Sequence, residues 1–364
     1  MTDAKSNHKQ PDSFIAGYDD VLLVTGATGF IGVKVVENLL NQGFRHIRCF
    51  VRPSSDPSKV ESLRAMGQGG AKVEVFQGNL LTREDCSAAV RGASIIFHLA
   101  VGGGSKSFPD AFMNSVVTTR NLLEAAASSK ALKRFVNVSS FAVYSNREKP
   151  HRRLLDETCP VEREAVRRWD AYCFAKVGQD EIIKDYCEKF GIPFVMVRPG
   201  YVYGPGHDAI TSRVGIDTFG IFLHLGGSNT VPFTYVDNCA QAIVLSGLQK
   251  DGVDGEVFNV VDDDLPSSRQ FLRLYKKNVR CFSSLYLPHF ASYVLCFLWE
   301  KYSVWSKGQL EPNFNRRKWH AVWKKTCYSN EKLKTRLGWT PKVTTAEGFN
   351  RYFAACRTAE GRHA

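Results

Sequence analysis

The sequence has 364 residues and a formal net charge of +12, and its 44% hydrophobic and 23% charged residues are those of a soluble globular protein. Its ten cysteines include no Cys-x-x-Cys pair, which argues against a structural zinc site or a disulfide framework and fits the reducing cytoplasm. We therefore expect no metal. Between 301 and 342 there are eleven Lys or Arg and two Glu, but no nucleic-acid-binding motif accompanies them, so we expect no nucleic-acid partner.

The first half of the chain repeats one pattern. Residues 1–19 are polar, contain no apolar run of signal-peptide length, and are expected to form a flexible tail. Short Val-, Ile- and Phe-rich runs then alternate with helical patterns, which predicts βαβ units and a buried parallel sheet. The expected strands are 21–24, 46–51, 72–76, 94–100, 134–140 and 193–199. We therefore expect a Rossmann-like doubly wound α/β fold, with a dinucleotide-binding domain at 20–200.

Beyond residue 200 the alternation loosens, and 255–261 is the one later strand that the pattern indicates. Residues 201–364 are expected to form mainly a smaller C-terminal α/β substrate lobe, interleaved with the first domain. This lobe should lie over the carboxyl edge of the sheet, where doubly wound folds bind ligands.

The turn after the first strand reads "VTGATGFIG" and places Gly26, Gly29 and Gly32 before a helix. Glycine allows the tight turn, lets the backbone approach a pyrophosphate, and lets helix and strand pack closely. The helix N-terminus then offers amide donors and a partial positive charge. In this βαβ context the triplet predicts dinucleotide binding.

The end of the second strand indicates which dinucleotide. An NAD site would have an acidic residue there to hold the ribose 2′-hydroxyl. The first polar residue here is Arg52, which suits a 2′-phosphate, and Ser54 and Ser55 add hydroxyl groups. Asp56 would have to reach back. NADP(H) is therefore favoured and NAD(H) is the alternative; Arg52 could also be an ordinary solvated loop residue, which is the less favoured interpretation.

Tyr172 and Lys176 stand four residues apart in "WDAYCFAKVGQDE", a helix-like segment. Residues i and i+4 share one face of an α-helix, so a phenol and an ammonium would lie side by side. A nearby cation stabilises phenolate, which suits proton transfer at neutral pH. Such a pair also occurs by chance in ordinary solvated helices.

Several motifs in order resemble those of the extended short-chain dehydrogenase/reductase family, also called the NAD-dependent epimerase/dehydratase group. The motifs are "TGATGFIG", "HLA", "VSSFAVY", "YCFAK", "RPGYVYGPG" and "FTYVDNCAQAI", and the resemblance runs from Val21 to about residue 342. In character the chain is most similar to the branch of 3β-hydroxysteroid dehydrogenases and dihydroflavonol reductases.

The resemblance implies a catalytic triad of Ser140, Tyr172 and Lys176. Tyr172 would be the general acid/base, Lys176 would hydrogen-bond the nicotinamide ribose and lower the pKa of the tyrosine, and Ser140 would hydrogen-bond the reacting oxygen. Tyr144 and Tyr201 are tentative substrate contacts, with core packing as the alternative for Tyr144.

The resemblance also implies the wider cofactor site. Where the family has "GDL", this chain reads "GNL", so Asn79 would serve near the adenine unless it is only a strand-end turn residue. The full set of expected cofactor-binding residues is Gly26, Thr28, Gly29, Phe30, Ile31, Gly32, Arg52, Ser55, Asn79, Leu80, Leu99, Ala100, Val101, Val138, Ser139, Tyr172, Lys176, Pro199, Gly200 and Val202.

Departures from the family bear on the reaction. The Asp-Glu pair of sugar-nucleotide dehydratases is replaced by "FAVY" after Ser140, so dehydration is not expected. Sugar-nucleotide epimerases commonly have an Asn where this chain has Gly200. The segment 146–157 would form a charged flap or a solvated loop.

The segment "LYLPHFASYVLCFLW" (285–299) is apolar but shorter than a membrane-spanning helix. It could line a lipophilic pocket, dip into a bilayer surface beside the basic segment 301–342, or form a buried lobe helix. Peripheral membrane contact through 285–305 is therefore one of the expectations.

We expect an NADP(H)-dependent oxidoreductase that interconverts a secondary alcohol and a ketone on a small sterol-, polyketide- or flavonoid-like substrate. The alternatives are a sugar-nucleotide 4-epimerase with retained NAD and a non-catalytic dinucleotide sensor, which would not need the triad. The family often dimerises through two long helices, here 110–129 and 168–190, so a homodimer is expected.

Overall fold

The computed structural model describes residues 13–67, 70–102, 107–147, 154–207, 209–218, 220–307 and 309–360. Most of the expected flap 146–157, namely 148–153, lies outside the described residues, as do residues 1–12 of the expected tail.

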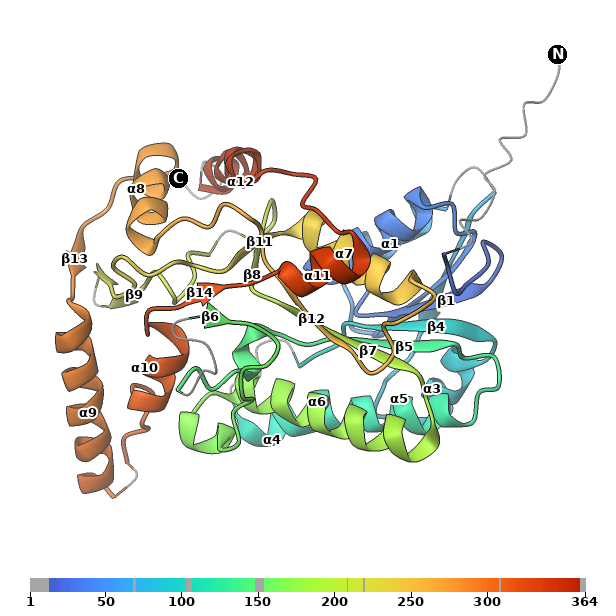
Figure 1. The fold of residues 1–364 in the computed structure, drawn as a ribbon, viewed down its shortest axis with the longest axis horizontal. Coiled ribbons are helices and arrows are strands. Elements are labelled where there is room, and N and C mark those ends of the chain that lie inside the picture. The colour runs from blue at the N-terminus through green and yellow to red at the C-terminus, as the bar shows by residue number, and fades with distance from the viewer. Residues whose placement is uncertain are drawn as a thin grey trace, which may run out of the picture.

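A parallel sheet of seven strands forms the centre of the molecule (Figure 1). In spatial order the strands are β12 (Val257–Val260), β7 (Phe194–Pro199), β5 (Arg134–Val138), β4 (Ala93–His98), β1 (Val21–Thr25), β2 (His46–Val51) and β3 (Lys72–Gln77). The predicted α/β fold is confirmed. All seven expected strands are present within two residues at each end, because continuous apolar runs bounded by turns are typical of buried parallel strands.

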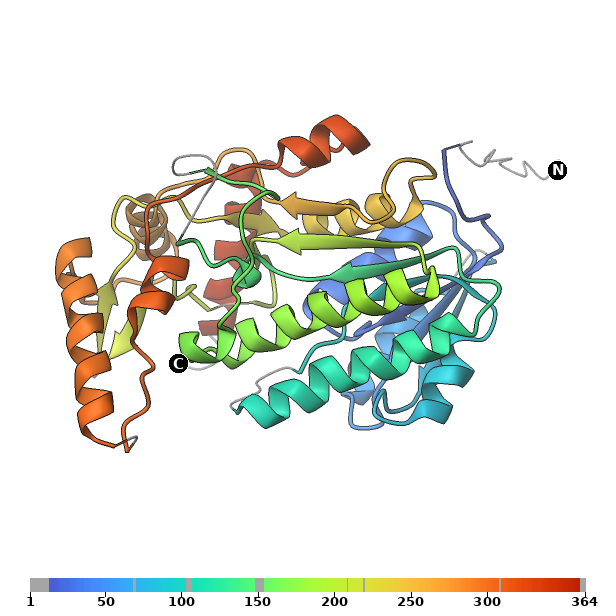
Figure 2. The same cartoon turned by 60° about the horizontal axis from the view of Figure 1, so that its bottom comes forward.

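Helices cover both faces of the sheet. The helices of one face are α1 (Phe30–Asn41), α7 (Val236–Leu248) and α11 (Glu331–Leu337), and those of the other are α3 (Arg83–Val90), α5 (Thr118–Ala127) and α6 (Ala171–Phe190) (Figures 1 and 2). Alternate residues of β1 enter opposite cores: Leu22 and Val24 pack with the first group of helices, and Leu23 packs with the second. Residues after 200 therefore contribute β12, α7 and α11 to the sheet layers.

Shorter helices connect these elements. They are α2 (Pro57–Ala65), α4 (Phe108–Ala111), a π-helical turn (Phe112–Val117) that joins α4 to α5, and two 3₁₀ turns, Phe141–Val143 and Ala165–Arg168.

The strand order reverses between β1 and β4, since the chain passes from β1 outward to β3 and then returns to β4 on the other side of β1. In doubly wound folds this switch point opens a crevice at the carboxyl ends of the strands. The strand ends on the two sides of this crevice carry the sequence motifs described above.

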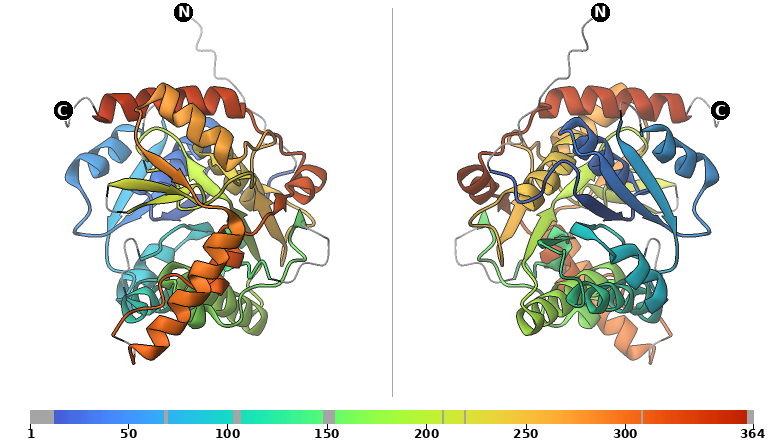
Figure 3. Two further views of the ribbon diagram at one scale, coloured as in Figure 1. Left: turned by 90° about the vertical axis from the view of Figure 1, so that its left-hand side faces the viewer. Right: turned by 90° about the vertical axis from the view of Figure 1, so that its right-hand side faces the viewer.

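The remaining elements form a lobe at the carboxyl ends of the strands (Figures 1 and 3). Its strands are β8 (Tyr201–Tyr203) with β11 (Phe233–Tyr235), β9 (Gly215–Thr218) with β10 (Ile221–His224) and β13 (Ser284–Tyr286), and β6 (Leu154–Leu155) with β14 (Cys327–Tyr328). Its helices are α8 (Ser268–Asn278), α9 (His289–Trp305), α10 (Arg316–Val322) and α12 (Thr345–Glu360).

An aromatic cluster holds the lobe together. The ring of Phe271 on α8 lies 4.7 Å from that of Phe233 on β11 and 5.5 Å from that of Phe349 on α12. All three rings are buried. These contacts join three elements that are far apart in the sequence.

We expect Phe271→Ala to lower the free energy of unfolding by about 3–5 kcal/mol, because it removes a buried ring and leaves a cavity. Urea unfolding followed by circular dichroism measures this change. Leu274→Ala, on the exposed side of the same helix, should change the free energy by no more than about 0.5 kcal/mol. Equal effects of the two substitutions would contradict the packing role of Phe271.

Candidate active site

At the switch point, the turn between β1 and α1 brings backbone against backbone. A Cβ atom at Gly26, whose φ is +71°, would lie 3.0 Å from the backbone nitrogen of Ala100. A Cβ atom at Gly32 would lie 2.1 Å from the carbonyl oxygen of Gly26. Side chains are therefore excluded from both positions, and strand, turn and helix approach more closely than other residues would allow.

The first turn of α1 opens onto this cradle. Its N-cap, Gly29, makes no side-chain cap hydrogen bond, so the amides of Phe30, Ile31 and Gly32 lack the side-chain acceptor that caps many helices. Thr28 belongs to the same turn. A glycine cradle beside an open helix N-terminus fits the pyrophosphate of a dinucleotide.

The loop after β2 presents Arg52 to solvent, where it forms no ion pair with any residue that the structure describes. Asp56 does not reach back to this position. It is the N-cap of α2, and its carboxylate accepts hydrogen bonds from the Ser58 amide (2.9 Å) and hydroxyl (2.7 Å). Ser55 is half-buried, and its amide donates to the Arg52 carbonyl at 2.9 Å. The guanidinium is therefore the charged group available at the end of β2.

The ends of β3 and β4 flank the cradle. Leu99, Ala100 and Val101 are all partly exposed after β4. Asn79 is exposed, but its side-chain oxygen accepts a hydrogen bond from the Leu81 amide at 3.0 Å. Asn79 thus forms the strand-end turn that was the alternative to adenine contact. Its contact with adenine stays a prediction. The next residue along, Leu80, is buried in the core.

Ser140 and Tyr172 meet at the carboxyl edge of the sheet. Ser140 lies two residues beyond β5, and its hydroxyl accepts a hydrogen bond from the Ala142 amide at 3.1 Å. Tyr172 lies in the first turn of α6 and is 44% exposed. Desolvation raises the pKa of the Tyr172 phenol, and a hydrogen bond with the Ser140 side chain acts against this rise. The side chains of Ser140 and Tyr172 are therefore adjacent.

Lys176 lies one turn further along α6 and is 3% exposed. Its ammonium donates a hydrogen bond to the Val138 carbonyl at 2.7 Å. Burial lowers the pKa of Lys176 to about 8, although the charge of Asp180 raises it. Lys176 thus lies on the same face of α6 as Tyr172, one turn away.

A buried ion pair fixes α6 against the sheet. The Asp180 carboxylate lies 2.9 Å from the Arg198 guanidinium on β7 and also accepts a hydrogen bond from the Asn137 amide group at 3.1 Å. The Arg198 guanidinium lies 4.9 Å from the ring centre of Tyr144. Tyr144 is 1% exposed and donates to Asn259 at 2.8 Å, so it occupies a packing position, and its contact with substrate stays a prediction.

Sequence reasoning missed a network that joins α6 to the strand ends. The two ring nitrogens of His98 lie 2.8 Å from the Thr25 hydroxyl and 2.9 Å from the Thr119 hydroxyl. Gln179 donates to Thr119 at 2.9 Å and to the Ala100 carbonyl at 3.2 Å. Burial lowers the pKa of His98 to about 3, so the ring is neutral. One signal was present: 172, 176 and 179 share a helix face.

Other expected residues lie around the same edge. Val138 and Ser139 are buried, and the Ser139 hydroxyl has no hydrogen-bond partner within the described ranges. Pro199, Gly200 and Val202 follow at the end of β7 and in β8. The Tyr201 hydroxyl donates to the Ala209 carbonyl at 2.8 Å, which places this side chain in the lobe.

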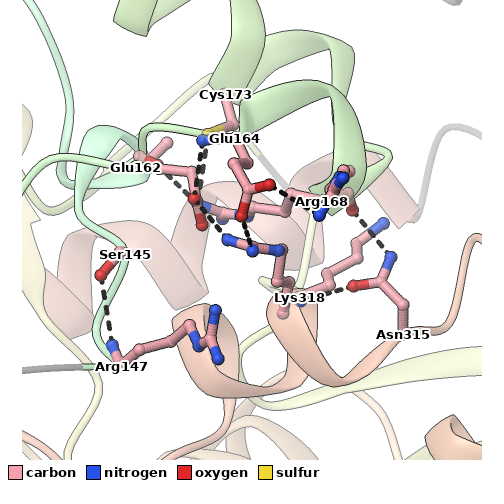
Figure 4. Close-up of polar contacts among 11 residues, drawn as sticks. Ser145, Arg147, Glu162, Glu164, Arg168, Cys173, Asn315 and Lys318 are labelled. Atoms are coloured by element: carbon pink, nitrogen blue, oxygen red, sulfur yellow. Dashed lines mark hydrogen bonds and ion pairs between the residues drawn. The ribbon is translucent and has the colours of Figure 1, made fainter.

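A polar clamp ties the lobe to the start of α6 (Figure 4). Arg317 on α10 pairs with Glu162 at 2.9 Å and also with Glu164. The Asn315 side chain donates to the Arg168 carbonyl at 2.9 Å. Arg168 itself donates to the Ala142 carbonyl at 2.6 Å. The segment that leads into Tyr172 is therefore held by contacts with α10 and with the turn after Ser140.

Comparison with protein families and curated proteins identifies relatives. Residues 22–260 match the model of the NAD dependent epimerase/dehydratase family. Cinnamoyl-CoA reductase 1 of Oryza sativa subsp. japonica is 31% identical over 191 residues, which are 52% of this chain and 55% of that protein. Sterol-4-alpha-carboxylate 3-dehydrogenase, decarboxylating, of Mus musculus is 23% identical over 342 residues, 90% and 88% of the two chains. The chain thus spans little more than half the length of the rice reductase.

Solved structures share the fold over nearly the whole chain. UDP-glucuronic acid 4-epimerase from Bacillus cereus, in complex with UDP-glucuronic acid and NAD, has a TM-score of 0.69 and 21% identity, and covers 93% of this chain and 99% of its own. Vestitone reductase from alfalfa has a TM-score of 0.64 and 18% identity, with 94% and 99% covered. Both a reductase and an epimerase are therefore among the structural neighbours.

We expect the affinity for NADPH to fall as the pH rises from 7 to 9. The lowered pKa of Lys176, about 8, means that its positive charge is present below that pH and lost above it. Lys176→Met should weaken NADPH binding about tenfold at pH 7 and remove this ionisation from the affinity profile. Fluorescence titrations with NADPH measure both effects. Lys184→Met, at an exposed position of the same helix, is the control, and an unchanged pH profile in Lys176→Met would contradict the assignment.

Proposed function

Since the chain belongs to the NAD-dependent epimerase/dehydratase family, we propose that it is an NADP(H)-dependent oxidoreductase that interconverts a secondary alcohol and a ketone on a small lipophilic substrate. The observation that carries the proposal is the adjacency of Ser140 and Tyr172, with the buried Lys176 one turn away. Position and charge together suit proton transfer to or from a reacting oxygen.

In this mechanism the bound nicotinamide cofactor supplies or accepts the hydride. The Tyr172 hydroxyl gives its proton to the ketone oxygen during reduction and takes it back during oxidation. The Ser140 hydroxyl donates a hydrogen bond to the same oxygen and orients it. The Lys176 ammonium stabilises the phenolate that Tyr172 becomes, because an opposite charge nearby favours the charged form.

The choice of NADP(H) rests on Arg52, the charged group at the end of β2 without an ion pair in the described structure. A guanidinium binds a phosphate through two parallel hydrogen bonds and a full charge. The only acidic residue of this loop, Asp56, already caps α2 through Ser58. Both features favour a 2′-phosphate over a free 2′-hydroxyl.

The lipophilic substrate class is supported by the relative of greatest overlap described above, the mouse sterol-4-alpha-carboxylate 3-dehydrogenase, which spans 90% of this chain. Cytoplasmic location and a homodimer through helices 110–129 and 168–190 complete the proposal. Phe112 and Met113, both exposed on the first of these segments, offer apolar surface to a second copy.

The alternative is a sugar-nucleotide 4-epimerase that retains NAD. The triad suits that reaction equally, and the Bacillus cereus epimerase has the same fold. However, a Cβ atom at Gly200 would lie 2.2 Å from the Pro232 carbonyl oxygen. Only glycine fits there, so this position offers no polar side chain to a sugar diphosphate, and we favour net hydride transfer.

The proposal is tested by analysing the nucleotide in the purified protein and then following NADPH oxidation with lipophilic ketones such as 3-oxo steroids and dihydroflavonols. We expect an empty protein that oxidises NADPH with one of these ketones. Tyr172→Phe should lower turnover about 10²- to 10⁴-fold and leave the affinity for NADPH unchanged. Tightly held NAD and turnover of UDP-sugars would establish the epimerase instead, and full activity of Tyr172→Phe would rule out its role in proton transfer.

Arg52→Asp should reverse the cofactor preference. It removes the partner of the 2′-phosphate and adds a carboxylate that repels that phosphate, so we expect the ratio of NADPH to NADH affinity to fall at least about tenfold. Titration with both cofactors measures the ratio. Arg64→Asp, on the exposed surface of α2, makes the same charge change nearby and should leave it unaltered. An unaltered ratio in Arg52→Asp would exclude this residue from the cofactor site.

A further inference from the structure

Helix α9 (His289–Trp305) has its side chains distributed opposite to those of an ordinary surface helix. The residues it buries are small: Ser292, Cys296 and Ser303, at helical spacing along one side. Ser292 accepts a hydrogen bond from the Trp319 indole of α10 at 2.9 Å, and Ser303 donates to the Leu310 carbonyl. Polar and small groups thus face the protein, whereas a surface helix normally turns its large apolar side chains inward.

The large apolar residues of α9 face solvent instead. Phe290 is 80% exposed, Trp305 is 75% exposed and Leu298 is 53% exposed. The exposed apolar side chains of α9 and of β13 just before it are Leu285, Tyr286, Phe290, Leu295, Phe297, Leu298, Tyr302, Val304 and Trp305. We call these residues the α9 surface. The alternative of a buried lobe helix for 285–299 does not hold, because these side chains are exposed. A contiguous apolar surface of this kind marks an interaction site.

The position of α9 favours contact with something outside the molecule. The helix stands at the end of the lobe that is farthest from the sheet, with α10 packed against it (Figures 1 and 3). Within the described residues no helix is long and apolar enough to cross a bilayer. The α9 surface can therefore lie on an apolar phase, and α9 does not span one.

The unpaired charges of α9 and of Lys307 just after it are positive, whereas Glu311, whose carbonyl accepts a hydrogen bond from the Trp299 indole at 3.0 Å, is an exposed acid nearby. Glu300 is the only acidic residue of α9, and it is paired with Arg316 at 2.7 Å. Lys301 is exposed among the apolar side chains, with its ammonium 5.7 Å from the ring centre of Phe297. Neither Lys301 nor Lys307 forms an ion pair with a described residue. Two cations thus remain for an anionic partner, and no unpaired acid of the helix opposes it.

We propose that the α9 surface docks on an anionic lipid bilayer, with Phe290, Leu298 and Trp305 inserted at the level of the headgroups. Exposed aromatic and aliphatic side chains with lysines among them are the composition of helices that lie in this interface. Each lysine adds electrostatic attraction to anionic headgroups. A second copy of the chain, the other candidate occupant, would place Lys301 against its own counterpart if the contact were isologous.

The docked surface is linked to the candidate active site. Helix α10 packs against α9, and from α10 Arg317 pairs with Glu162 while the neighbouring Asn315 binds the Arg168 carbonyl. The segment bound in this way directly precedes α6, whose first turn holds Tyr172. Docking would present the substrate lobe to a lipophilic substrate held in the bilayer; this last step rests on the proposed function.

The test is flotation of the purified full-length protein with phosphatidylcholine vesicles that contain or lack phosphatidylserine. We expect binding that requires phosphatidylserine and weakens as salt is added. The double variant Phe290→Ser/Trp305→Ser should bind vesicles at least about tenfold more weakly. Lys301→Glu should bind the anionic vesicles about tenfold more weakly. Leu274→Ser is the matched control, since Leu274 is an exposed apolar residue of α8 outside the α9 surface, and it should bind as the unaltered protein does.

Affinity for NADPH and circular dichroism of each variant establish that it is folded. Absence of vesicle binding at low salt, or undiminished binding of the double variant, would overturn the proposal. The proposal would also be overturned if the unaltered protein formed a dimer and did not bind vesicles, and if the double variant were a monomer. The surface would then join two copies of the chain. Flotation requires no turnover, so its failure leaves the proposed reaction untouched, and the failure of the reaction leaves the docking result untouched.

Discussion

The buried ion pair between Asp180 and Arg198 is the contact on which the candidate active site depends, because it fixes the depth and rotation of α6 on the sheet. Removing one partner of such a pair leaves an uncompensated buried charge and costs about 3–5 kcal/mol, whereas the intact pair contributes little net stability. Its role here is positional. With Asp180 held against β7, the helix face that begins two turns earlier places Tyr172 and Lys176 at the carboxyl edge.

Two kinds of construction meet at that edge. The cofactor side is built from backbone, since Gly26 and Gly32 admit no side chain and the start of α1 presents bare amides. The reacting side is built from charge. Burial keeps His98 neutral, and the charge of Lys176 reinforces this effect, so in the proposed mechanism Lys176, and not His98, is the cation beside Tyr172. Under the proposed function, this division would keep the pyrophosphate site rigid while the surroundings of Tyr172 and Lys176 set their pKa values.

The sequence predicted those parts of the molecule that local rules determine. The parallel strands, the glycine turn and the one-turn spacing of Tyr172 and Lys176 each follow from residues within about ten positions of one another. The clamp did not follow, because nothing in the residues around Arg168 indicates that Asn315 will bind its carbonyl. The outward face of α9 was equally hidden: the apolar run at 285–299 is compatible with burial, and only the packed structure shows that small residues occupy the inner side.

The clamp also sets the order in which the molecule can become competent during folding. The contact from Asn315 to Arg168 spans 147 residues and that from Arg317 to Glu162 spans 155, and closing loops of this length is slow relative to forming helices and neighbouring strands. The sheet strands up to β7 and the cradle of α1 precede α10 in the chain, so a nascent chain can complete them first. The approach to Tyr172 is secured only when α10 has emerged. The glycine cradle would thus form before the approach to Tyr172 is secured.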